Sequence, residues 1–195
     1  MLKLIGIPYD ANSSFLKGPS HAPPRIRLME VEGSANSFAE NGLEVKDKVN
    51  YEDCGDMRFE GTDAQKAYET IQANIKGLIA DGSKILSFGG DHSVSFPVID
   101  AVADKYPQLH ILHLDAHADL YDNFDDNPYS HASPFARLME TGKIASLTQV
   151  GIRTFNTHQK EQAERFGVKV VEMKDFNFDF IADLPSPLYI SVDLE

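Results

Sequence analysis

Short apolar runs alternate with longer amphipathic stretches along most of the chain. The runs are rich in Ile, Leu and Val, and several lack a two-residue alternation of polarity, which is typical of strands covered on both faces. They lie at Leu2–Ile7, Lys84–Phe88, His110–Leu114, Ser146–Ile152, Val168–Met173 and Leu188–Val192. Helical periodicity marks the stretches Ala64–Ala80, Ser93–Tyr106, Ser133–Glu140 and His158–Phe166. This strand–helix–strand order predicts parallel strands with right-handed crossovers, hence a three-layer αβα fold with a mainly parallel sheet.

Two polar stretches interrupt this rhythm. Residues Asp10–Pro24 form a connection rich in Pro, Ser and Asn that leads into a helix near Arg25. Residues Tyr121–Ser130 form an acidic loop directly after a predicted strand. Because α/β proteins keep their sites in loops at the carboxyl ends of parallel strands, we expect this loop to border a site.

Composition narrows the function classes. The chain has 195 residues, with 18 Lys and Arg against 30 Asp and Glu, and thus a formal net charge of −12. This charge argues against binding nucleic acid or an anionic membrane and is compatible with a small cationic substrate or a carboxylate-rich metal site. The sequence shows no signal peptide or membrane span, and its lone cysteine, Cys54, has no intramolecular partner. We therefore expect a single domain over residues 1–195 in a reducing, cytoplasmic location.

The sharpest chemical feature is an Asp-x-His-x-Asp pattern at the end of a predicted strand. Asp115, His117 and Asp119 follow the run His110–Leu114 at a spacing of two. In an extended segment such residues project to the same side, so their side chains could converge on one point. Carboxylate oxygens with one imidazole suit Mn²⁺ or another divalent first-row ion. The alternative is an acidic loop with a capping Asp and a surface His.

Two further strand ends carry similar groups. His92 lies in GGDHS (residues 89–93), where two glycines permit a tight turn and Ser93 is a candidate N-cap. Asp193 and Glu195 lie in SVDLE (residues 191–195), after the last predicted strand. Buried carboxylates need a cation or strong hydrogen-bond donors to offset desolvation. Three strand ends with metal-ligating residue types therefore favour a metal site over a set of unrelated turns.

These three motifs, read as GGDHS, LDAHADLYD (residues 114–122) and SVDLE, resemble the metal signatures of the ureohydrolases, the family of arginase and agmatinase. Further segments are similar to the plant-type arginase and agmatinase-like group: NSSFLKGP (12–19), APPRIR (22–27), YSHASPFAR (129–137) and QVGIR (149–153). The resemblance runs from residue 4 to residue 195 and implies an arginase/deacetylase-like αβα fold.

The resemblance also implies a binuclear manganese centre with two Mn²⁺ per chain. By motif position, His92, Asp115, Asp119 and Asp193 would surround one ion. His117 and Glu195 would join Asp115 and Asp193 around the other. A metal-bridging hydroxide would then attack the guanidinium carbon of agmatine, arginine or another linear guanidino compound and yield an amine and urea, in arginine and polyamine metabolism.

The resemblance assigns His131 as the proton shuttle for the leaving amine, a task that suits an imidazole at neutral pH. The alternative for His131 is a loop histidine that bonds to the following helix. Asn127 and Ser130, in the same acidic loop, are weaker candidates for substrate contacts. His113 shares strand parity with Asp115 and is either a core histidine or a support for that carboxylate. His158 has no convergent partner in the sequence.

Two departures from the family pattern favour a second hypothesis. The family has Asp where this chain has Glu195, and the longer side chain would reshape the second metal site. Family members also continue past the last predicted strand, so we expect this chain to lack the C-terminal part of the family domain. The alternative function is therefore a metal-binding homologue without turnover that acts as an assembly or regulatory subunit. The family forms trimers and hexamers, so a homo-oligomer is compatible with the resemblance.

Overall fold

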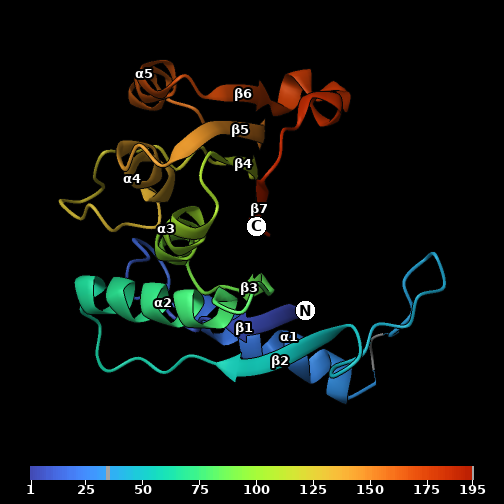
Figure 1. Ribbon diagram of the computed structural model, residues 1–195. Helices are drawn as coiled ribbons and strands as arrows, with labels where there is room; N and C mark the ends of the chain where they lie inside the picture. The colour runs from blue at the N-terminus through green and yellow to red at the C-terminus, as the bar shows by residue number, and fades with distance from the viewer. Residues whose placement is uncertain (34–35, 195) are drawn as a thin grey trace. The chain divides into compact units, whose positions relative to one another are not determined.

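The structure is a computed structural model that describes residues 1–33 and 36–194. The chain divides into two compact units, residues 1–94 and 95–195, each of which is an α/β unit with parallel strands (Figure 1). The α/β class and the parallel pairing confirm the fold predicted from the sequence. The strands form two sheets, whose order the sequence pattern did not define.

The first unit contains a three-stranded sheet in the order β2-β1-β3. Its strands are β1 (Leu2–Gly6), β2 (Tyr51–Asp56) and β3 (Lys84–Phe88), and its helices are α1 (Ala22–Val31) and α2 (Ala64–Ile79). Short 3₁₀ turns η1 (Pro19–His21) and η2 (His92–Val94) precede α1 and follow β3. Strands β1 and β3 pair in register from Leu2↔Lys84 to Gly6↔Phe88, so both end at the same edge.

Helix α2 illustrates why the periodic pattern was reliable. Asp63 accepts a hydrogen bond from the Lys66 amide at 2.8 Å and so caps the first turn. The buried side chains recur every four residues, at Ala67, Ile71, Ile75 and Ile79. The helix ends before Gly82, whose φ of 91° suits glycine. Local capping and a single apolar face therefore define this helix within one residue of the predicted range.

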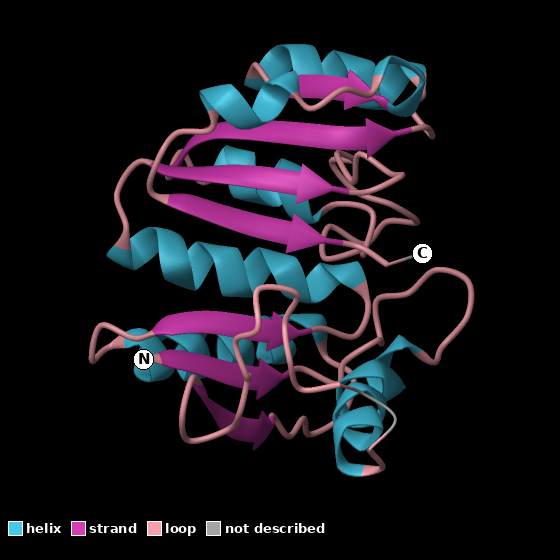
Figure 2. Cartoon of the chain, turned by 90° about the vertical axis from the view of Figure 1, so that its right-hand side faces the viewer, coloured by secondary structure: helices cyan, strands magenta, loops and turns pink. Residues whose placement is uncertain are grey.

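The second unit contains a four-stranded sheet in the order β6-β5-β4-β7. All four strands run in the same direction (Figure 2). The strands are β4 (Leu109–Leu114), β5 (Ile144–Ile152), β6 (Lys169–Glu172) and β7 (Leu188–Val192). The helices are α3 (Ser95–Lys105), α4 (Pro134–Glu140) and α5 (Thr157–Phe166), with 3₁₀ turns η3 (Met173–Asp175) and η4 (Asp179–Asp183). Strand β4 lies between β5 and β7, which makes its carboxyl end central in this sheet.

Three local expectations were wrong. Strand β2 was not predicted, because its sequence YEDCGD is mostly polar. Ser93 lies inside η2 and does not cap a helix; the Asp91 carboxylate accepts from the Ser93 amide instead. Coverage on both faces holds for β4 and β5 but not for β7, where Ile190 is 55% exposed. Among the described residues, no helix has the length and hydropathy that crossing a membrane requires.

Candidate metal centre

The carboxyl edge of the β4–β7 pair brings two of the predicted ligands to neighbouring positions. The parallel register ends with Leu114 opposite Val192, so Asp115 and Asp193 each follow directly after the paired strands. The Asp193 amide donates to the Leu114 carbonyl at 3.0 Å, and the Asp115 amide donates to the Val150 carbonyl at 3.2 Å. Backbone pairing thus fixes the start of both carboxylate-bearing segments at one edge of the sheet.

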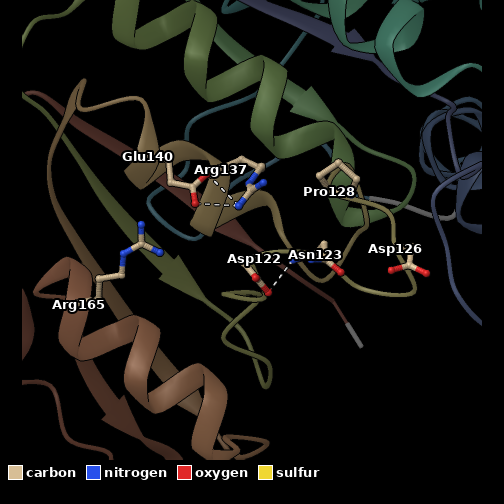
Figure 3. Close-up of a pocket in the computed structure, with 7 residues that line it drawn as sticks. All are labelled: Asp122, Asn123, Asp126, Pro128, Arg137, Glu140 and Arg165. Atoms are coloured by element: carbon tan, nitrogen blue, oxygen red, sulfur yellow. Dashed lines mark hydrogen bonds and ion pairs between the residues drawn. The ribbon is translucent and has the colours of Figure 1, made fainter.

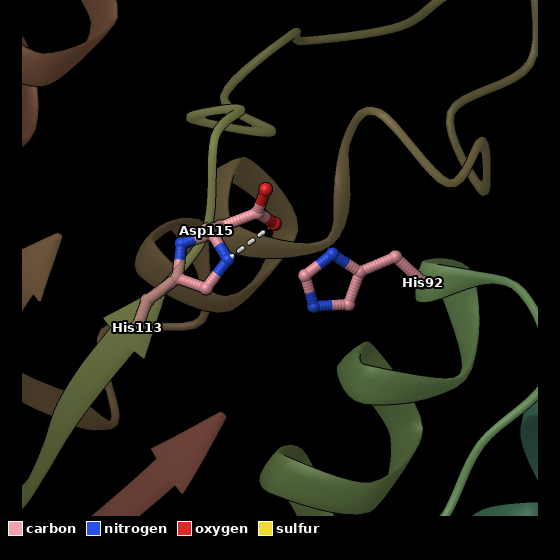
Figure 4. A group of neighbouring side chains, drawn as sticks. All are labelled: His92, His113 and Asp115. Atoms are coloured by element: carbon pink, nitrogen blue, oxygen red, sulfur yellow. Dashed lines mark hydrogen bonds and ion pairs between the residues drawn. The ribbon is translucent and has the colours of Figure 1, made fainter. Parts of the chain in front are cut away.

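The side chain of Asp115 is almost completely enclosed, at 1% exposed. Its Oδ2 accepts from His113 Nε2 at 2.8 Å, and its Oδ1 accepts from the His117 amide at 2.7 Å (Figure 4). His117 Nδ1 lies 3.7 Å from the same Oδ1. A buried carboxylate is costly unless donors or cations offset its desolvation, and here two histidine residues supply the donors.

His113 is completely buried and is hydrogen-bonded to the Asp115 carboxylate. Its Nδ1 lies 3.0 Å from Gln149 Nε2, which also donates to the Ala118 carbonyl at 2.6 Å. Since the Gln149 amide nitrogen must face that carbonyl, His113 Nδ1 accepts and His113 Nε2 carries the proton that bonds Asp115. The Phe135 ring packs against the imidazole at a centroid distance of 3.9 Å. His113 is therefore both a satisfied core histidine and a support for Asp115.

Asp119 is buried, but not for the reason that the spacing suggested. Strand β4 ends at Leu114, and Asp119 has a left-handed φ of 49°. The parity argument for an extended segment therefore fails at Asp119. Its carbonyl instead accepts from the Phe135 amide at the start of α4, at 3.3 Å. His117 keeps a 41% exposed side chain, and its segment pairs with Thr154 after β5.

His92 belongs to the first unit, where it follows the Gly89–Gly90 turn after β3. The Asp91 amide donates to the Tyr9 carbonyl at 2.9 Å, and a Cβ at Gly90 would lie 2.0 Å from that oxygen. Only glycine fits this approach, so the turn that carries His92 is locked against the end of β1. Burial raises the pKa of Tyr9 to about 12, and the negative charge of Asp91 adds to the effect. His92 is half-buried.

The loop that follows Leu120 carries the predicted catalytic and substrate-binding residues. Asn127 Oδ1 accepts from the Tyr129 amide at 2.9 Å, and the buried Ser130 hydroxyl accepts from the Ala132 amide at 3.3 Å. His131 is half-buried, and its Nδ1 lies 3.4 Å from Ser130 Oγ. Both Asn127 and Ser130 thus help to build the loop, and a role in contacting substrate stays a prediction.

An open cavity of about 380 Å³ lies beside this loop, between the loop and the helices α4 and α5 (Figure 3). Arg137 pairs with Glu140 at 2.8 Å inside it, while Arg165 extends from α5. The lining residues are Asp122, Asn123, Asp126, Pro128, Arg137, Glu140 and Arg165. Among the described residues, none of the predicted metal ligands lines this cavity, and neither does His131, so the acidic side chains Asp122 and Asp126 border a different surface.

The donor chemistry of the β4–β7 edge fits a hard divalent cation. Carboxylate oxygens are the ligands such an ion prefers, and the carboxylates of Asp115 and Asp193 follow directly after the paired strands β4 and β7. Among the described residues, no group of three candidate donor atoms within 4.8 Å of one another includes His117, Asp119 or Asp193. Glu195 lies outside the described residues.

Gln149, which contacts His113, was not predicted as a site residue. It lies in the QVGIR segment, and its contact with His113 arises from their pairing across β4 and β5. The sequence signal for Gln149 is its place as a polar residue inside an otherwise apolar strand. A buried amide requires hydrogen-bond partners, so such a residue is expected to contact another polar group.

The fold and the candidate site together define an α/β protein with carboxylates and histidines at the carboxyl ends of parallel strands. The arginase family model matches residues 2–195, and the chain belongs to this family. This confirms the resemblance inferred from the motifs.

Individual relatives agree with that assignment. The chain is 43% identical to arginase 1, mitochondrial, of Arabidopsis thaliana, over 98% of this chain and 60% of that protein. The solved arginase of Medicago truncatula is 42% identical, with a TM-score of 0.82 over 89% of this chain and 56% of that chain. Proclavaminate amidino hydrolase of Streptomyces clavuligerus is 31% identical, with a TM-score of 0.84 over 98% of this chain and 67% of that chain. The chain therefore spans about 60% of the length of the curated plant arginases that it matches.

Proposed function

We propose that the chain is a manganese-dependent amidinohydrolase that converts a linear guanidino compound, agmatine or arginine, to an amine and urea. Membership of the arginase family and similarity to an amidino hydrolase support this reaction class. The observation that carries the proposal is the placement of Asp115 and Asp193 directly after two paired parallel strands, with Asp115 held by His113. Two carboxylates at one sheet edge can bridge a pair of divalent ions.

We assign the ligands of the proposed binuclear site by motif position. His92, Asp115, Asp119 and Asp193 would hold one Mn²⁺, and His117 and Glu195 would complete the second with the two bridging carboxylates. A bound ion pair would supply a water whose pKa is lowered toward neutrality. Within the chain, the hydrogen bond from His113 Nε2 orients the Asp115 carboxylate.

His131 is proposed to deliver the proton that the leaving amine requires. It is half-buried at the end of the acidic loop, where its imidazole is in contact with both the loop and solvent. The net charge of −12 supports attraction of a cationic guanidinium substrate over long distances. Asn127 and Ser130 are proposed to touch the substrate from the same loop.

The test measures bound metal and product separately. The chain is equilibrated with Mn²⁺ and desalted, its metal content is measured by inductively coupled plasma mass spectrometry, and urea release is assayed with agmatine and with arginine. Asp115→Asn and Asp193→Asn should each lose bound Mn²⁺ and urea release. Asp179→Asn, an exposed carboxylate on η4, is the matched control and should change neither. Unchanged Mn²⁺ content in both Asp115→Asn and Asp193→Asn would refute the ligand assignment.

His131→Ala separates catalysis from metal binding. Turnover should fall by about 10²–10⁴-fold while Mn²⁺ content stays at the level of the unmodified chain. If Mn²⁺ is bound but neither substrate releases urea, the alternative of a metal-binding assembly or regulatory homologue replaces the enzyme hypothesis. A cytoplasmic location and a homo-oligomeric state stay predictions.

A further inference from the structure

Tyr121, the first residue of the acidic loop, is held on two sides by the start of helix α5. Its hydroxyl accepts a hydrogen bond from Asn156 Nδ2 at 2.5 Å. Its ring stacks on the His158 imidazole, with a centroid distance of 5.5 Å and an interplanar angle of 17°. His158 Nε2 also lies 3.2 Å from Asp122 Oδ1, so the next loop residue is close to the same helix.

The position of Asn156 is fixed because its side chain makes two hydrogen bonds. Its Oδ1 caps α5 by accepting from the Gln159 amide at 2.9 Å, while its Nδ2 reaches Tyr121. The amide plane is thereby fixed by the helix, and the helix start becomes a rigid support. The backbone adds to this, since the Arg153 and Thr154 amides both donate to the Ala116 carbonyl, at 2.8 and 3.0 Å.

From Tyr121, ring contacts continue to the proposed proton shuttle. The Tyr121 and Phe124 rings meet edge to face at 5.1 Å, and Phe124 meets the His131 imidazole edge to face at 6.3 Å. Phe124 and Asn127 pair across a two-residue turn, which fixes the Phe124 ring relative to the loop. The Tyr121 amide donates to the Ala132 carbonyl at 3.1 Å and closes the base of the loop beside His131.

We infer that Tyr121, clamped by Asn156 and His158, is a positioning residue that fixes the loop carrying His131. This inference rests on the proposed function for the role of His131, but the clamp itself is a property of the chain without metal or substrate. Aromatic pairs contribute modestly one by one, so removing the whole side chain should loosen the loop more than removing the hydroxyl. A change that removes the Asn156–Tyr121 hydrogen bond but keeps the cap of α5 should therefore loosen the loop without opening the helix.

The test is amide hydrogen exchange in the metal-free chain. The reporters are the hydrogen-bonded amides of Phe124, Asn127 and Ser130, which exchange only when the loop opens. Tyr121→Ala should speed their exchange by about tenfold or more, and Tyr121→Phe by a smaller factor. Asn156→Ser keeps a capping oxygen but is too short to reach Tyr121, so it should speed loop exchange while the Gln159 amide stays protected. Tyr68→Ala on α2 is the control and should leave the loop unchanged.

If the chain releases urea, the kcat of the Tyr121 variants provides a second test. Tyr121→Ala should lower kcat by about tenfold or more through misplacement of His131, and Tyr121→Phe should restore most of it. Loop exchange in Tyr121→Ala within twofold of the unmodified chain would overturn the inference, as would an unchanged kcat. Faster exchange in a chain that releases no urea would support the clamp and count only against the proposed function.

Discussion

Gly90→Ala is expected to destabilise the first unit strongly, because the added methyl group would overlap backbone atoms. A Cβ at Gly90 would lie 2.0 Å from the Tyr9 carbonyl oxygen, 2.8 Å from its carbonyl carbon and 2.9 Å from its nitrogen. All three are backbone atoms, so no side-chain rotation can relieve the overlap. The turn must move away from β1 by about 1 Å or more, given ordinary carbon–oxygen contacts of about 3.3–3.6 Å.

The structure allows the cost to be worked out. Separation breaks the hydrogen bond from the Asp91 amide to the Tyr9 carbonyl, at 2.9 Å, which costs about 1–3 kcal/mol where the groups stay buried. Overpacking adds about 1–3 kcal/mol, and the lower chain entropy of Ala in the unfolded state returns about 0.4–1 kcal/mol. The free energy of unfolding should therefore fall by about 3 kcal/mol, within a range of about 1–6 kcal/mol.

Urea denaturation followed by far-ultraviolet circular dichroism measures this loss, with two glycine variants as controls. A Cβ at Gly89 meets only the Val94 Cγ2, at 2.9 Å, and this side chain can rotate, so Gly89→Ala should cost about 1 kcal/mol or less. Gly77 lies inside α2, and a methyl group added there would meet no atom within 4 Å, so Gly77→Ala should stabilise by about 0.5–1 kcal/mol. A Gly90→Ala midpoint equal to that of Gly89→Ala would refute the reasoning.

Three further outcomes follow from other contacts. The bidentate Arg27 guanidinium, with bonds of 2.7 and 2.9 Å, lowers the pKa of Asp53. This contribution to stability is present above the unfolded pKa of about 4 and is lost as pH falls through the lower folded pKa, so Asp53→Asn should destabilise more in urea at pH 7 than at pH 3. Lys143→Met should cost about 1–3 kcal/mol in urea titrations, because Lys143 Nζ lies 2.7 Å from the buried Asp100 carboxylate, and Lys143→Arg should cost less. Asp126→Gly should raise the melting temperature by a few degrees, equivalent to about 0.5–1 kcal/mol, because Asp126 has a left-handed φ of 57°; a fall would contradict the strain argument.

Local signals predicted most of the fold. Strands β3 and β7 lie within their predicted bounds, and α2 differs by one residue, because apolar runs and helical periodicity are properties of neighbouring residues. Strand β2 carries no such signal. It forms because β1 offers a parallel edge, with Leu2 opposite Tyr51, and this pairing joins segments about fifty residues apart.

The candidate site was predictable to the extent that it depends on strand ends. The motif located Asp115 and Asp193 at the correct edge, since carboxyl ends of parallel strands coincide. The spacing of two does not carry over to Asp119, because the chain leaves the extended conformation after Leu114 and Asp119 has a left-handed φ. The role of Asp119 as a ligand stays a prediction. The two-residue alternation of side chains holds only within a strand, whereas the proposed metal ligands lie in the loop that begins after the strand ends.

The contact of His113 with Asp115 joins residues two positions apart and could be proposed from strand parity. The contact that holds His113 itself could not, because it joins two strands that are distant in the sequence. Gln149 meets His113 only because β5 pairs with β4, and this contact decides which His113 nitrogen carries a proton. If Gln149 were replaced by Glu, its carboxylate would favour a proton on Nδ1, and His113 could bond Asp115 through Nε2 only as a cation. The orientation of the buried Asp115 carboxylate therefore depends on His113, two residues earlier in the chain, and on Gln149 in the neighbouring strand β5. No local sequence pattern connects these three residues.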